Sequence, residues 1–376
     1  MAPPQPAPPP GTPIFRTPDE LLHDIFLRLP GAVDLARASA VCPSFRHLIT
    51  DHAFLRRYHA LHPPPLIGAV GDVPSTAGRT WRPIDFLDGR ALLAGAPVQE
   101  ESGVLGVRRF QYHNFLVRDL AVCDPVHRRY ILLPAVPGDL KALARERELH
   151  DLETFLAPGD EEEDPLSFRV MCLVQCRMNM LFVFSSLDGQ WRSLAFYQWS
   201  APQATFDRPP AEDGLFDRQF VHGCFCWRLL FLNKLVLLDP RTMDFSAVDL
   251  PPELGWSSSF VIVEAPQGML GMLSKVQDQD SEDGTYLLKY SSLRNNQWHL
   301  EKFIPLPVKA TLVGVGGGYL LMVALHTTSS HEKLKFELLS VDVKTLQIEL
   351  FAELTESTLP DRLYVGFPPS LSVPTI

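Results

Sequence analysis

The hydrophobic periodicity of the chain changes once, at the three consecutive prolines 63–65. Before these prolines, apolar residues recur at the three- and four-residue spacing of amphipathic helices. After them, short apolar runs of strand length alternate with Gly, Pro, Asp and Asn. The sequence therefore predicts a multidomain α + β protein, with a small helical domain over residues 14–62 and a large all-β domain over residues 66–376.

The composition narrows the class of protein and its partners. The 376 residues carry a net charge of −10, so attraction to the phosphate backbone of nucleic acid is not expected. No run reaches the roughly 18 apolar residues that a membrane span needs. Six cysteines in a chain of this length do not suggest a disulfide framework, which favours the reducing cytoplasm or nucleus. Residues 1–13 contain seven prolines and predict a disordered arm and no signal peptide.

Residues 18–29 predict the first helix, with Thr17 or Asp19 as its cap and Pro30-Gly31 at its end. Its apolar residues form a wide stripe of Leu21, Leu22, Ile25, Phe26 and Leu29. Asp34 is expected to cap a second helix, and Pro43 to open a third. A fourth short segment carries Phe54, Leu55, Tyr58 and Leu61.

Three helices of this length make a core that is too small to be stable alone. Domains below about 40 residues usually need a metal, a disulfide or a partner. The histidines show no metal-ligand spacing and are expected on solvated faces; they are His23, His47, His52 and His59. The residues thus predict stabilisation by a second polypeptide, and the alternative is a plain helical cap on the large domain.

The segments PDELLHDIFLRLP and VDLARASAVCPSFRHLI resemble the F-box family over about residues 15–57. Thr17 and Phe45 depart from the family pattern, which has Leu and usually Trp at these positions. The resemblance implies docking on a Skp-family adaptor and, through it, on a cullin. By position, the implied adaptor contacts are Pro18, Leu21, Leu22, Ile25, Phe26, Leu29, Pro30, Leu35, Val41, Cys42 and Phe45. Not all of them are expected to face outward, because Ile25 and Leu48 must also fill the core.

The large domain contains two alternating kinds of hairpin. One kind joins an apolar strand through Ser-Ser and a polar turn to Trp191 or Trp298; the other turns at Asp124, Asp239 or Asp342. Side chains of Asp and Ser are expected to bond the turn backbone. Interleaving the two kinds gives a period of roughly 50 residues, the length of a kelch-type propeller blade. Residues 66–376 then predict an all-β propeller-like domain of about six blades, with five or seven as the alternatives.

Other motifs point to structure and not to chemistry. The glycines at 314–318 lack the ending of a phosphate loop and predict a tight turn. Cys224-x-Cys226 and Cys172-x3-Cys176 predict buried free thiols and no metal. Residues 139–156 predict an insertion with one helix, followed by an acidic run at 160–164. A second acidic run lies at 278–283, and both are expected to be solvated loops, with recruitment of basic targets as the alternative.

The β domain is similar to the propeller-like associated domains of plant F-box proteins. The two resemblances together imply a non-catalytic, substrate-recognition subunit of an SCF-type ubiquitin ligase, with no cofactor and with an unknown protein target on the propeller. No residue is predicted for target binding, because a fold does not specify its ligand. The alternatives are a propeller-fold enzyme and a scaffold outside the ligase that carries an F-box-like helical cap.

Overall fold

The computed structural model describes most of the helical segment and of the β domain. The described residues are 17–29, 32–62, 66–71, 81–95, 119–125, 128–145, 151–159, 164, 167–175, 180–195, 215–229, 232–255, 258–277, 286–306, 309–326, 335–354 and 360–366. The chain forms two compact units that divide between residues 65 and 66. The prolines at 63–65 and both acidic runs, apart from Asp164, lie outside the described residues.

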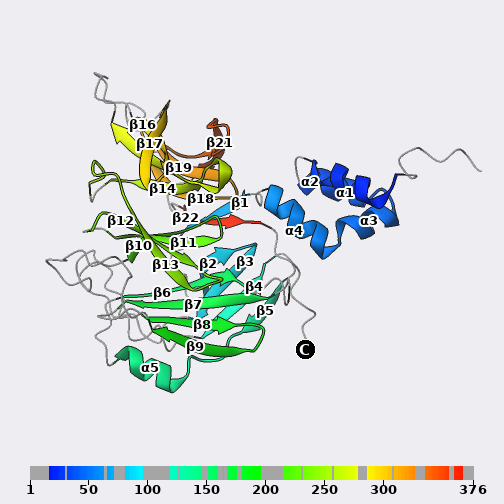
Figure 1. Ribbon diagram of the computed structural model, residues 1–376, viewed down its shortest axis with the longest axis horizontal. Helices are drawn as coiled ribbons and strands as arrows, with labels where there is room; N and C mark the ends of the chain where they lie inside the picture. The colour runs from blue at the N-terminus through cyan, green and yellow to red at the C-terminus, as the bar shows by residue number, and fades with distance from the viewer. Residues whose placement is uncertain are drawn as a thin grey trace, which may run out of the picture. The chain divides into compact units, whose positions relative to one another are not determined.

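Unit 1 contains four short helices within the described residues, one more than the three that the sequence predicted, because the fourth segment is helical as well (Figure 1). They are α1 (Asp19–Leu27), α2 (Ala32–Ser39), α3 (Pro43–Ile49) and α4 (His52–Leu61). The predicted caps of the first two helices are wrong. Pro18 is the N-cap of α1 and has no side-chain cap bond, and Asp34 lies in the first turn of α2, where it pairs with Arg37. Pro43 opens α3 as predicted, and the Asp51 carboxylate caps α4 by accepting from Phe54 N at 2.9 Å.

Unit 2 contains five four-stranded antiparallel sheets within the described residues, and each sheet is a propeller blade (Figure 1). Blade 1 contains β2 (Trp81–Leu87), β3 (Arg90–Gly95), β4 (Leu120–Asp124) and β5 (Arg129–Leu132). Blade 2 contains β6 (Asp151–Pro158), β7 (Phe168–Gln175), β8 (Met180–Ser185) and β9 (Gln190–Ala195). Blade 3 contains β10 (Leu215–Val221), β11 (Cys224–Leu229), β12 (Lys234–Asp239) and β13 (Asp244–Asp249).

Blade 4 contains β14 (Phe260–Glu264), β15 (Leu270–Gln277), β16 (Tyr286–Arg294) and β17 (Gln297–Pro305). Blade 5 contains β18 (Ala310–Gly316), β19 (Tyr319–His326), β20 (Lys335–Asp342) and β21 (Ile348–Leu354). A sixth sheet has two strands only, β1 (Leu66–Gly71) and β22 (Pro360–Val365). One helix, α5 (Gly138–Arg145), precedes β6, and a single 3₁₀ turn at Pro266–Gly268 joins β14 to β15.

The propeller prediction is confirmed, but the number of blades is five and not about six. Each hairpin found in the sequence is the last hairpin of one blade, in the order Asp124, Ser185, Asp239, Ser291, Asp342. Five hairpins therefore count five blades correctly. The estimate of six came from dividing the length of the domain by the average length of a blade. That length includes the long connections at 96–118 and 196–214, so the number of blades came out too high.

Three of these hairpins use the side chains that the sequence indicated to bond the turn backbone. The prediction is wrong for Ser291 and Ser292, which lie within strand β16 and precede the turn at 295–296. The Asp239 carboxylate accepts from Arg241 N at 2.8 Å, and the Asp342 carboxylate accepts from Lys344 N at 2.8 Å. The Ser185 hydroxyl accepts from Leu187 N at 3.3 Å. These side chains replace backbone partners that a tight turn leaves open, so they fix where these three hairpins reverse.

The predicted insertion with one helix over 139–156 is confirmed for its first half and wrong for its second half. Residues 138–145 are helical, but 151–158 form β6, the first strand of blade 2. Phe155 and Leu156 are buried on opposite faces of this strand, against blade 3 and blade 1. A strand that is buried on both faces shows no alternation of polar and apolar residues, so sequence periodicity does not separate it from a helix.

The β1–β22 sheet lies in the ring between blade 5 and blade 1. Leu363 and Val365 of β22 pack against β18 of blade 5, while Tyr364 packs against Phe86 of blade 1 with ring centroids 5.5 Å apart. Gly89 N donates to Val365 O at 2.9 Å. The first and last described strands of the domain thus close the ring. Without them, the facing sides of blade 5 and blade 1 would expose apolar side chains to water.

Gly316 permits the close approach of β22 to β18. A Cβ at Gly316 would lie 2.6 Å from Val365 Cγ2, closer than real Cβ contacts. The predicted turn is confirmed at Gly317 and Gly318, whose φ angles of 61° and 80° favour glycine. The glycine run is therefore a turn preceded by a strand surface that admits the closing strand.

A buried charge network joins the first strands of blades 1, 2 and 3. The guanidinium of Arg218 on β10 donates to Asp85 on β2 and to Glu153 on β6, each at 2.7 Å. Both carboxylates have second donors, Leu156 N for Asp85 and Trp227 Nε1 for Glu153. The two carboxylates raise the pKa of Arg218 despite its burial, so the guanidinium stays charged and holds three blades together.

No helix in the parts of the chain that the structure describes is long and apolar enough to cross a membrane.

Replacing Gly316 with Ala is expected to lower the free energy of unfolding of the β domain by about 1–3 kcal/mol, the usual cost of overpacking. Val365 is short and branched at Cβ, so it cannot swing away from the added methyl. Thermal unfolding of the full chain measures the effect. Gly314→Ala is the matched control, because its Cβ would meet Leu363 at an ordinary 3.8 Å. Equal unfolding midpoints for the two variants would show that Gly316 is not needed for ring closure.

Replacing Arg218 with Met is expected to destabilise the β domain by about 3–5 kcal/mol, because two buried carboxylates lose their counter-ion. The control is Arg192→Met, which removes an exposed ion pair with Asp188 and is expected to cost less than about 1 kcal/mol. Urea unfolding followed by tryptophan fluorescence compares the two. A loss no larger than that of the control would contradict the role of Arg218.

Candidate docking site

The helical unit builds its core from one face of each helix. The buried side chains are Leu22, Phe26, Leu27, Leu35, Phe45, Ile49, Phe54 and Tyr58. Phe26 makes edge-to-face contacts with Phe45 and Phe54, with centroids 5.1 and 6.5 Å apart. Aromatic side chains supply much buried area from few residues, which suits a core this small.

Helix α4 is tied to the end of α1 by two hydrogen bonds. Tyr58 donates its hydroxyl to Leu29 O at 3.2 Å, and a ring nitrogen of His62 lies 2.7 Å from Leu27 O. Leu27 is the last residue of α1, where carbonyls have no internal donors, and Leu29 lies two residues beyond the end of the helix. The sequence pattern identified Tyr58 only as an apolar residue of a fourth segment and gave no signal for these bonds.

Two large apolar side chains of α1 face solvent instead of the core. Leu21 and Ile25 are spaced one turn apart and are 55% and 47% exposed, and Val41, after α2, is 59% exposed. We call these three residues the apolar patch. Isolated exposed apolar residues are common, but a leucine and an isoleucine on one helical face in so small a unit mark a surface that a partner can cover.

The structure divides the implied adaptor contacts into three groups. Pro18, Leu21, Ile25 and Val41 are exposed, and Leu29 and Cys42 are half-buried. The side chains in the core are Leu22, Phe26, Leu35 and Phe45, which support the surface from beneath. Pro30 lies outside the described residues.

Two detailed expectations about this unit are wrong. Ile25 points to solvent and not into the core, because Leu22 and Phe26 take the inward face of α1. His23 is half-buried, with its ring 5.3 Å from that of Phe54, and not on a solvated face. His47 is exposed as expected, and the side chains of His52 and His59 lie outside those described.

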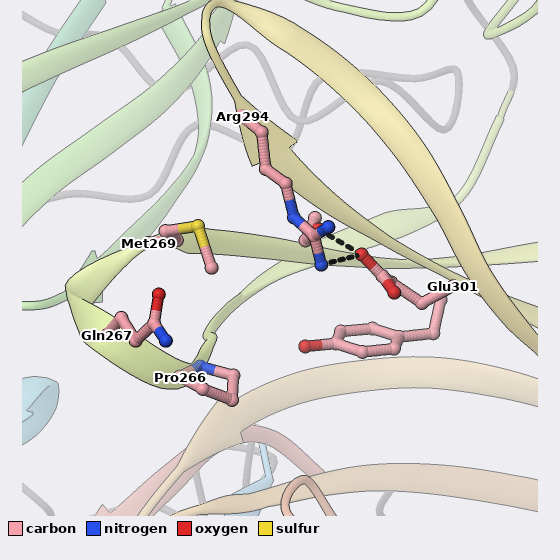
Figure 2. Close-up of a pocket in the computed structure, with 7 residues that line it drawn as sticks. Pro266, Gln267, Met269, Arg294 and Glu301 are labelled. Carbon is pink, nitrogen blue, oxygen red and sulfur yellow. Dashed lines mark hydrogen bonds and ion pairs between the residues drawn. The ribbon is translucent and has the colours of Figure 1, made fainter.

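A second candidate site is a small pocket on blade 4 (Figure 2). Its volume is about 420 Å³, and it lies between the β14–β15 turn and the ends of β16 and β17. Gln267 and Met269 lie across the pocket from Glu301 in Figure 2. One oxygen of Glu301 accepts from Arg294 Nη2 and from Ser292 Oγ, both at 2.5 Å. The ion pair neutralises Arg294, so the pocket suits a neutral polar group better than an anion.

Tyr290 also lines this pocket. Burial raises the pKa of its phenol, and the neighbouring Glu301 carboxylate raises it further, so the hydroxyl stays protonated at neutral pH. The described residues hold no group of three or more His, Cys, Asp or Glu side chains placed to bind a metal ion.

The thiols that the sequence singled out are packing residues. Burial raises the pKa of Cys172 and of Cys226 to about 12, so both stay protonated at neutral pH. The prediction of buried free thiols is confirmed for these two, whereas Cys224 is half-buried and Cys176 lies outside the described residues.

Comparison with known protein families decides the nature of the helical unit. Residues 16–61 match the family model F-box-like. These residues are an F-box-like domain. The match contains all four helices and the whole apolar patch, and it ends at residue 61, before β1 begins at Leu66.

The remaining comparisons carry no conclusion about this chain. No curated protein matches the sequence. Solved structures similar to the chain include TolB from Acinetobacter baumannii, at 9% identity and a TM-score of 0.34 over 64% of this chain and 50% of TolB. A mutant of the GH43 protein BlXynB from Bacillus licheniformis has 10% identity and a TM-score of 0.35 over 79% of this chain and 59% of that protein. A post-proline cleaving enzyme from Rickettsia typhi has 10% identity and a TM-score of 0.34 over 75% and 37%.

Replacing Leu22 with Ala is expected to destabilise the F-box-like domain by about 2–5 kcal/mol, because the change leaves a cavity in the core. Replacing Leu21, its exposed neighbour, is expected to change the stability by no more than about 0.5 kcal/mol. Hydrogen–deuterium exchange of peptides from residues 17–62 in the full chain distinguishes the two. Faster exchange in the Leu21→Ala variant than in Leu22→Ala would reverse the assigned inner and outer faces of α1.

Proposed function

We propose that this chain is the substrate-recognition subunit of an SCF-type ubiquitin ligase. In this proposal the F-box-like domain binds a Skp-family adaptor, the adaptor binds a cullin, and the propeller holds the target protein. The observation that carries the proposal is the apolar patch of Leu21, Ile25 and Val41 on an F-box-like domain, followed in the same chain by a propeller.

Burial of the patch supplies a physical reason for adaptor binding. Covering a large apolar side chain that is otherwise half exposed contributes about 1–2 kcal/mol, so three of them contribute several kcal/mol to association. The small domain also gains stability from the complex, since only the folded form presents the patch. Adaptor binding and folding of the F-box-like domain are therefore coupled in this proposal.

The chain itself carries out no catalysis in this proposal. It holds the target close to the ubiquitin-charged enzyme on other subunits, which raises the effective concentration of target lysines there. The predicted place of action is the cytoplasm, the nucleus or both. Kelch-type blades and a plant origin are the finer predictions that come from the sequence resemblance.

The test replaces Leu21 and Ile25 together with Asp. Burial of two carboxylates in place of two apolar side chains is expected to weaken adaptor binding by at least about 3 kcal/mol, or roughly 100-fold. Co-purification of the full chain with a co-expressed Skp-family adaptor measures the loss. Leu22 is unsuitable for this test, because its replacement by Asp would unfold the domain.

The matched control is Arg57→Asp, which adds negative charge at an exposed residue of α4 outside the implied contacts. It is expected to keep adaptor binding. Full binding by the Leu21/Ile25 variant would refute the docking surface. Capture of a cullin together with the adaptor separates a ligase subunit from a scaffold that binds the adaptor alone.

A further inference from the structure

A large apolar residue near the start of each outer strand faces the preceding blade. In blades 2 to 5 these residues are Trp191, Phe245, Trp298 and Ile348. Trp191 is 7% exposed, and its indole donates to Pro134 O, after the outer strand of blade 1, at 2.8 Å. Trp298 does the same to Asp249 O of blade 3, also at 2.8 Å. Phe245 and Ile348 pack into the clusters shared with blade 2 and blade 4.

Tyr130 has the same position in blade 1, but no complete blade precedes it. It pairs with Cys123 just as Trp191 pairs with Phe184, and it is 66% exposed. Leu132, on the same face of β5, is 59% exposed. The sixth position of the ring is held by β1 and β22 alone within the described residues, and these strands cover only the inner part of the face of blade 1.

Blade 5 also has exposed apolar side chains on its face toward the sixth position. Leu66 and Ala69 of β1 pack against its inner strands, around Leu321 and Val323. Farther out, Leu325 is 38% exposed and its strand partner Phe336 is half-buried. Every other blade has four strands, whereas the described residues supply only two at the sixth position, and these two leave the outer side chains of blade 5 exposed.

The edge of β1 completes the site. Strand β1 pairs with β22 on one side and with no other described strand on its second edge. We call this edge, together with Tyr130 and Leu132 of blade 1 and Leu325 and Phe336 of blade 5, the open sixth position. An unpaired edge beside apolar side chains is suited to the addition of an extended strand.

Charge selects among the possible occupants. Glu349 pairs with Ser340 on the face of blade 5 that borders the open sixth position, and it is exposed. The whole chain carries a net charge of −10. A second copy of this chain would bring equal negative charge and be repelled, whereas a basic segment would be attracted.

We propose that the open sixth position binds an extended segment of a partner protein, with apolar side chains at alternate positions and basic residues beside them. The segment adds to β1 as a further strand, so its backbone bonds the free edge. Alternate side chains of a strand point to opposite faces, which places apolar groups against blade 1 and blade 5 at once. This inference rests on the proposed function, in which the segment belongs to the target of the ligase.

The test selects peptides with the full chain, from a displayed library of random twelve-residue peptides. Enriched sequences are expected to alternate apolar residues and to contain Lys or Arg. A fluorescent peptide of the enriched sequence is then expected to bind at least ten times more weakly to Leu132→Glu and to Leu325→Glu, which alter opposite sides of the site. Fluorescence anisotropy measures the affinities.

Ile131→Glu is the matched control, because Ile131 lies between Tyr130 and Leu132 but pairs with Val122 on the face toward blade 2. It is expected to keep the affinity. The proposal is overturned if no peptide is enriched, which is also the result expected if a segment of the chain itself occupies the site. It is equally overturned if Ile131→Glu weakens binding as much as Leu132→Glu, or if light scattering shows a dimer that Leu132→Glu dissociates. Adaptor co-purification is scored separately for every variant, so failure of the proposed function is distinguishable from failure of this site.

Discussion

Closure of the ring by β1 and β22 is the constraint on which the β domain depends. Each blade is apolar on both faces and is covered only by its neighbours, so one unclosed side would expose two faces. The closing strands come from the two ends of the domain, more than 290 residues apart in sequence (Leu66 pairs with Val365). Gly316 makes room for this pair on one side, and the Phe86–Tyr364 contact secures it on the other.

The contacts between neighbouring blades explain the role of the tryptophans in the hairpins found in the sequence. Trp191 and Trp298 each bond a carbonyl at the end of the preceding outer strand, so two of the five blades are locked to their neighbours at the rim. Arg218, Asp85 and Glu153 lock three blades near their first strands. Rim and centre are thus held by different chemistry, the rim by neutral hydrogen bonds and the centre by a satisfied charge network.

The F-box-like domain follows a different principle, because its core is complete without its most exposed apolar residues. The sequence predicted three helices and a short fourth segment, a surplus of apolar surface and a list of implied contacts, and the structure adds that the fourth segment is the helix α4. It did not separate Leu22 from Leu21, or Ile25 from Phe26, because a wide stripe has no sharp edge and a few degrees of helix rotation decide which side chain is inside. The bonds from Tyr58 and His62 to the end of α1 are long-range and left no local pattern.

The sequence by itself determined the two-part organisation, the F-box-like segment, the strand-rich second domain and the five hairpins, because each follows from periodicity or turn chemistry within a few neighbouring residues. Only the tertiary structure decided that the blades number five, that residues 151–158 are a strand, and that the glycine run faces β22. The same holds for the exposure of Tyr130, which occupies the position that Trp191 fills in blade 2. These features depend on which distant segments meet in the ring, and burial by a distant neighbour leaves no repeat in the local sequence.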